Sequence, residues 1–157
     1  MNLLKLLGRD QRGAAAIELA LALPVMATLL VGMIDISRGF SAKLQLEQAA
    51  QRSIEKAMQA KKTLTLFNTL KAEGAAAAGV AESAVTVEYW LECEGVKKTG
   101  ASMAAAYETN CDAGETYARY LTVEIQKVYT PMFRTRFAGA NANGTYTLKG
   151  KAGIRVQ

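Results

Sequence analysis

Few residues in this chain could do chemistry, and the commonest catalytic side chain is absent. The 157 residues contain no histidine, which excludes Ser-His-Asp and Cys-His catalysis and His-ligated zinc. Three carboxylates, Glu88, Glu92 and Glu94, lie close together in the sequence. General acid–base chemistry uses such carboxylates, but the solvent face of a half-buried strand shows the same pattern. We therefore predict that the chain is not an enzyme and has no catalytic residue, no metal site and no cofactor.

Two cysteines, Cys93 and Cys111, are the other candidates for covalent chemistry. They are 18 positions apart, so the Cys-x-x-Cys spacing of a redox motif is absent. Both follow a long apolar segment that is expected to place them outside the cytoplasm, where disulfides persist. We predict a Cys93–Cys111 disulfide that closes a loop rich in glycine and alanine. Two free buried thiols are the alternative interpretation.

An apolar run at residues 14–34 dominates the N-terminal region, and Glu18 is its only ionisable member. As a helix the 21 residues would be about 32 Å long, which matches the hydrocarbon core of a bilayer. A carboxylate at the bilayer centre costs about 2.5 to 3.5 kcal/mol, so Glu18 must find a partner or reach the headgroups. Pro24 lacks an N–H, and we expect the helix to bend there.

Basic residues ahead of the run predict its orientation. Lys5, Arg9 and Arg12 precede it with only Asp10 opposing them, so the N-terminus is expected to stay in the cytoplasm and the rest to lie outside. Three interpretations of this N-terminus are open: a cleaved secretory signal, an uncleaved membrane anchor, and a prepilin-like leader followed by a transmembrane helix. A secretory signal fits poorly, because its apolar region is only about 7 to 15 residues long.

The prepilin interpretation rests on the spacing of a glycine and a glutamate. A prepilin is cut before its apolar run, after a glycine, and has a glutamate at the fifth position of the new N-terminus; Gly13 and Glu18 have this spacing. The segment RGAAAIELALALPVMATLLVGMIDISR, residues 12–38, resembles the N-terminal segment of TadE-like pseudopilins, the minor pilins of the tight-adherence (Tad) type IV pilus system. Further matching positions are Leu21, Leu23, Pro24, Gly32 and Asp35. The three alanines after the glycine depart from major pilins and favour a minor pilin.

The resemblance implies a prepilin-type leader at 1–13 and a cut between Gly13 and Ala14 by an inner-membrane prepilin peptidase. The new amine of Ala14 would lie one helical turn from Glu18, or on a neighbouring subunit, so pairing would offset the cost of burying both charges. The implied partners are other pilin-like subunits, the inner-membrane assembly platform, the peptidase and membrane lipids. The implied location is the bacterial inner membrane, crossed once, with the C-terminal domain in the periplasm or carried into an extracellular pilus.

Beyond the transmembrane helix at 14–34, we predict that the helix continues outside the membrane at 35–60. Apolar residues recur on one face of this part, at Leu46, Ala50, Ile54, Ala57 and Met58. A second helix is predicted at 65–78, and alternating residues predict strands at 85–91, 121–125 and 146–156, the last entered through an Asn143-Gly144 turn. The expected fold is α+β: a long N-terminal helix and an extracytoplasmic domain at 61–157 with an antiparallel sheet of three or four strands, the lollipop of type IV pilins.

The C-terminal region is basic. Residues 127–157 contain six basic residues and no acidic ones, with Tyr129, Phe133, Phe137 and Tyr146 interleaved. We expect these aromatic side chains to alternate into the core and the basic ones to form a solvated face, so nucleic-acid binding is not predicted. The predicted function is that of a pseudopilin in Tad pilus assembly. The alternative is an unprocessed, single-pass, membrane-anchored binding domain that uses this basic region on DNA or polysaccharide.

Overall fold

The computed structural model describes residues 12–59, 64–100, 102–134 and 139–156. The chain divides into two compact units, Met1–Arg38 and Gly39–Gln157. Helix α2, Arg12–Gln59, contributes to both units and contains Pro24. Most of the predicted leader, residues 1–11, lies outside the described residues.

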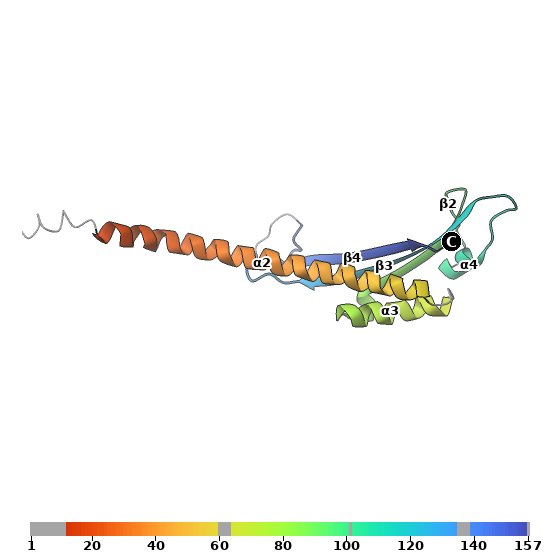
Figure 1. Cartoon of the computed structure of the whole chain (residues 1–157), viewed down its shortest axis with the longest axis horizontal. Coiled ribbons are helices and arrows are strands. Elements are labelled where there is room, and N and C mark those ends of the chain that lie inside the picture. The colour runs from red at the N-terminus through yellow and green to blue at the C-terminus, as the bar shows by residue number, and fades with distance from the viewer. Residues whose placement is uncertain (1–11, 60–63, 101, 135–138, 157) are drawn as a thin grey trace, which may run out of the picture. The chain divides into compact units, whose positions relative to one another are not determined.

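The second unit contains a four-stranded antiparallel sheet (Figure 1). The strands are β1 (Val85–Cys93), β2 (Val96–Lys97), β3 (Tyr117–Tyr129) and β4 (Tyr146–Arg155). Their order in the sheet is β2-β1-β3-β4, so β3 lies at the centre between its two long neighbours. The predicted α+β class and the number of strands are confirmed.

Helices cover one face of this sheet. Helix α3, Leu64–Ala78, lies beside the C-terminal part of α2 (Figure 1), and a single 3-10 turn, η1 (Glu82–Ala84), connects it to β1. A short helix, α4 (Met103–Glu108), begins where the Ser102 hydroxyl accepts a hydrogen bond of 3.1 Å from the Ala105 N–H. The helix predicted at 65–78 is confirmed, whereas α4 was not predicted.

The core lies between the helices and the inner face of the sheet. Alternation along β3 sends Leu121, Val123 and Ile125 inward. The buried members from the helices and β1 are Leu46, Ala49, Ala50, Ile54, Ala57, Phe67, Leu70, Ala75, Val85 and Tyr107. The predicted stripe on α2 is therefore confirmed at four positions and wrong at Met58, which is exposed because it lies in the last turn of the helix, beside the end of the sheet.

A glycine brings α2 against β4. A Cβ atom placed on Gly150 would lie 2.3 Å from the carbonyl carbon of Leu46 and 2.5 Å from the backbone nitrogen of Glu47. The backbone of the helix therefore rests directly on the backbone of the strand, an approach that only glycine permits. This contact fixes the part of α2 that starts at Gly39 on the sheet.

Two expectations about the segment before β4 have different outcomes. Gly144 has φ +74°, so the Asn143-Gly144 turn uses the left-handed conformation that glycine favours. The expectation that the aromatic residues point into the core is wrong for Phe133, which is exposed because it follows the end of β3 on a bend, where the alternation of a strand no longer applies. Phe137 lies outside the described residues.

Candidate functional site

The first candidate surface is the apolar part of α2. Among the described residues, one helix is long and apolar enough to cross a membrane, and it is α2. None of the side chains in its most apolar stretch is buried. Its exposed large side chains are Ile17, Leu19, Leu21, Leu23, Val25, Met26, Leu29, Leu30, Met33 and Ile34. Such a surface needs lipid or other apolar helices around it. By length and composition, the helix is compatible with a single membrane anchor.

The expected cleavage bond, between Gly13 and Ala14, lies in the first turn of α2. Gly13 is exposed, and nothing lies within 4 Å of a Cβ placed on it. Backbone N–H groups in the first turn of a helix have no partner within the helix, so this turn opens more easily than the rest. Cleavage at this bond stays a prediction.

Glu18 is an exposed residue of the same apolar surface. It lies four residues after Ala14, which is about one turn, or about 6 Å along the helix axis. Among the described side chains, none forms a hydrogen bond or an ion pair with its carboxylate. The role of Glu18 in registering subunits stays a prediction.

Pro24 lies inside α2 and removes one backbone N–H from the helix. One turn later, the Thr28 hydroxyl donates a hydrogen bond of 2.8 Å to the carbonyl of Val25. A threonine that bonds back to the preceding turn hides its own polar group from an apolar surrounding. The bend expected at Pro24 stays a prediction.

The structure brings Cys93 and Cys111 together as a disulfide, with Cα atoms 5.6 Å apart. Cys93 is the buried last residue of β1, and Cys111 lies in the loop after α4. The Arg119 guanidinium fastens the same loop, because it donates hydrogen bonds of 3.3 Å to the carbonyls of Tyr107 and Thr109. Burial raises the pKa of the Tyr107 hydroxyl, and Arg119 lowers it in part. Tyr107 thus stays neutral at ordinary pH.

A pair of hydrogen bonds joins the residues at the other end of this loop. The Glu94 carboxylate accepts hydrogen bonds from the Thr116 N–H at 2.7 Å and from its hydroxyl at 3.1 Å. Close by, Glu115 could offer an oxygen to a metal together with the two cysteine sulfurs, all within 4.8 Å of one another. Because these sulfurs are bonded to each other and the thiolate is the metal-binding form, the group does not make a metal site.

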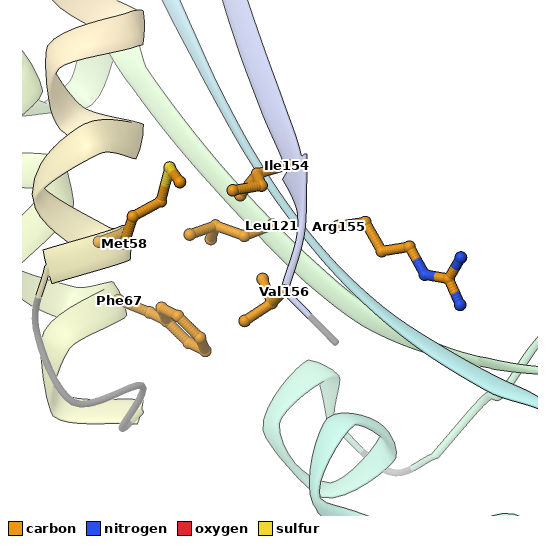
Figure 2. Close-up of a pocket in the computed structure, with 7 residues that line it drawn as sticks. Met58, Phe67, Leu121, Ile154, Arg155 and Val156 are labelled. Atoms are coloured by element: carbon orange, nitrogen blue, oxygen red, sulfur yellow. The ribbon is translucent and has the colours of Figure 1, made fainter.

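The cavity with the most apolar lining lies where α2, α3, β3 and β4 meet near the end of the chain (Figure 2). Its volume is about 180 Å³, and its lining residues are Ala57, Met58, Phe67, Leu121, Ile154, Arg155 and Val156. Figure 2 shows Ile154 and Val156 on the side of α2 and α3, whereas the Arg155 side chain points the other way. The cavity therefore offers no acid or base for catalysis.

Sequence reasoning missed the aromatic cluster that α4 builds. The Tyr107 ring packs edge-on against Phe67 and Tyr89, with ring centroids 5.4 and 5.3 Å apart. A signal was present, because Ser102 precedes the residues MAAAYE as an N-cap precedes a helix. The alanine-rich composition had instead indicated only a loop.

Fold and surface together define a class: an α+β domain whose N-terminal helix is long and apolar enough to anchor it in a membrane. Residues 13–54 match the family model described as TadE-like protein, which confirms the predicted resemblance over these residues. The TadE-like pilin family is structural and non-enzymatic. The match to this family suggests that the chain is involved in the Tad pilus. No curated protein and no solved structure is similar enough to match the chain.

Proposed function

We propose that this chain is a pseudopilin, or minor pilin, that acts in the assembly of a tight-adherence pilus and has no enzymatic activity. The observation that carries the proposal is the family match, which begins at Gly13, the residue after which the cut is expected. The exposed apolar helix supports it, because helices of this kind associate in membranes through their surfaces. Other pilin-like subunits, the inner-membrane assembly platform and the peptidase are the proposed partners.

In the proposed mechanism, residues 14–34 hold the precursor in the bacterial inner membrane, with the domain at 61–157 in the periplasm. Cleavage after Gly13 then creates an ammonium group on Ala14. Glu18 pairs with that ammonium, in the same subunit or in a neighbour, and thereby sets the register between helices. The part of α2 from residue 35 to 59 connects the span to the domain, whose surface meets the partners.

The test of processing is the N-terminal sequence and intact mass of the protein, taken from membranes of cells that carry its own prepilin peptidase. Ala14 is the expected first residue. Gly13→Leu should block the cut, and Gly32→Leu is a matched control, because nothing lies within 4 Å of a Cβ at either position. A chain that still begins at Met1 would favour the unprocessed anchored binding domain. A start near residue 40 would indicate secretion.

The test of registration is Glu18→Val. This variant should insert and be cleaved as the native chain is, since only the charge within the apolar surface is lost. It should no longer co-purify with other pilin-like subunits. Glu18→Asp, which keeps the charge, should retain part of the association. Unchanged co-purification of Glu18→Val would overturn the registering role while leaving the processing result intact.

A further inference from the structure

The short turn after β3 exposes apolar side chains that the core does not use. Its residues are 130–134; Pro131 is buried, whereas Met132 is 59% and Phe133 53% exposed. Arg134 lies against Gly144, because its backbone carbonyl would be 3.0 Å from a Cβ on that glycine. The turn therefore lies beside the Asn143-Gly144 turn, and Met132 and Phe133 are exposed there.

The sequence that contains this turn is basic. Lys127 precedes the turn, Arg134 is its last residue, and both are exposed; residues 127–157 contain six basic residues and no acidic ones. Exposed apolar side chains between basic ones are the composition of segments that lie at an anionic membrane surface.

The length of the chain limits how far this turn can lie from the proposed span. A Cβ on Gly39 would lie 3.4 Å from the ring of Tyr129, the last residue of β3. Gly39 is five residues after Ile34, the end of the proposed span, and five residues reach at most about 18 Å when fully extended. This limit holds whatever the angle between the two compact units. The headgroup layer itself extends about 5 to 8 Å beyond the hydrocarbon.

We infer that the turn at 130–134 docks in the headgroup layer of the membrane that α2 spans. Met132 and Phe133 enter the boundary between headgroups and acyl chains, and Lys127 and Arg134 contact lipid phosphates. The occupant is an anionic phospholipid surface, selected by the charge of this region and by its short tether to the span. The inference rests on the membrane anchoring in the proposed function. It adds a second contact by which the domain is held to the bilayer.

The experiment uses the full chain in vesicles of phosphatidylcholine, with or without phosphatidylglycerol, that contain a lipid with a nitroxide on its headgroup. Trp90→Phe removes the one native tryptophan, and Phe133→Trp then places a fluorescent probe on the turn. Val96→Trp is the matched control, because Val96 is 68% exposed. It lies on β2, beside the opposite end of β3, about 40 Å away at roughly 3.3 Å per residue.

The expected result is strong quenching of the Phe133→Trp probe in vesicles with phosphatidylglycerol, and little quenching of the Val96→Trp probe. Adding Arg134→Gln should weaken docking about fivefold, the effect of one basic residue at an anionic surface. Equal quenching of the two probes would overturn the inference. So would a blue-shifted but unquenched Phe133→Trp probe, which would mean that a second copy of the chain covers the turn.

Flotation of the vesicles separates this inference from the proposed function. A chain that floats with the vesicles and whose Phe133→Trp probe is unquenched contradicts the docked turn alone. A chain that does not float contradicts the membrane anchor, and the docked turn with it.

Discussion

Two parts of one helix carry apolar side chains for different surroundings. In the first part of α2, Leu29 is 64% exposed, whereas in the second part Leu46 is 1% exposed. The first part is apolar on all sides, which suits lipid or neighbouring membrane helices. The second part has one apolar stripe rich in alanine, with charged residues opposite. Small side chains let its backbone approach the sheet closely, as the contact at Gly150 requires.

The comparison teaches that periodicity, more than hydrophobicity, identifies the surroundings of a helix. Burial against a sheet needs only one apolar face, so the polar residues Glu47 and Arg52 are tolerated in the second part. A helix in lipid has no such tolerance, and Glu18 is the single exception in residues 14–34. Glu18 is therefore the position in the first part whose charge needs either a partner or the headgroups, and the Glu18→Val test distinguishes the two.

The largest expected effect separates the two parts directly. Leu46→Ala should lower the free energy of unfolding by about 3 to 5 kcal/mol, because it empties a buried site. Leu29→Ala should change it by less than about 0.5 kcal/mol, because the side chain is 64% exposed. The measurement is urea unfolding of the full chain in detergent micelles, followed by Trp90 fluorescence. Equal losses would mean that residues 14–34 belong to the folded core.

The disulfide should have the next largest effect, and only on the domain. It closes a loop of 18 residues, so replacing both cysteines by serine should cost about 3 kcal/mol by the entropy of the open loop. Cleavage after Gly13 should be unchanged. The measurement is the same unfolding experiment with and without reductant. Reductant should destabilise the native chain and leave the double variant unaffected; stability that is equal in all four cases would contradict this.

Much of the fold could be predicted because it follows from short-range patterns. The alternation of Val85 to Leu91 and the apolar run at 14–34 are local signals, and they gave the strands and the anchor. The exposure of Phe133 could not be obtained in this way. It depends on where β3 ends, and β3 extends to Tyr129, four residues beyond the predicted strand. For the candidate site, the sequence predicts which residues act, namely Gly13, Ala14 and Glu18. Their roles depend on the peptidase and on other subunits, so only the processing and co-purification experiments can test them.

The close approach of α2 to β4 predicts a smaller effect that distinguishes the two faces of the sheet. Gly150→Ala places a Cβ against the backbone of Leu46 and should cost about 2 kcal/mol, because backbone cannot move aside easily. Gly153→Ala is the matched control on the opposite face of the same strand. Its Cβ would meet the Thr122 methyl at 2.8 Å, and a side chain can shift. Unfolding of the two variants should therefore differ, and equal costs would show that α2 does not rest on β4.

The smallest expected effect lies on the face of the sheet opposite the core. The Lys149 ammonium donates a hydrogen bond of 3.0 Å to Glu124, and this bond lowers the pKa of the carboxyl below its usual 4.5. Because the folded pKa is lowered, the stabilisation is complete above the pKa of the unfolded chain and is lost as the pH falls through the folded value. Glu124→Gln should therefore lower the free energy of unfolding by about 0.5 kcal/mol at neutral pH, which is typical of a partly exposed ion pair. Below about pH 4 the loss should be smaller. The control is Glu88→Gln on the same face, which should change stability less. A loss for Glu124→Gln that did not shrink in acid would show that packing of the side chain, and not its charge, stabilises this face.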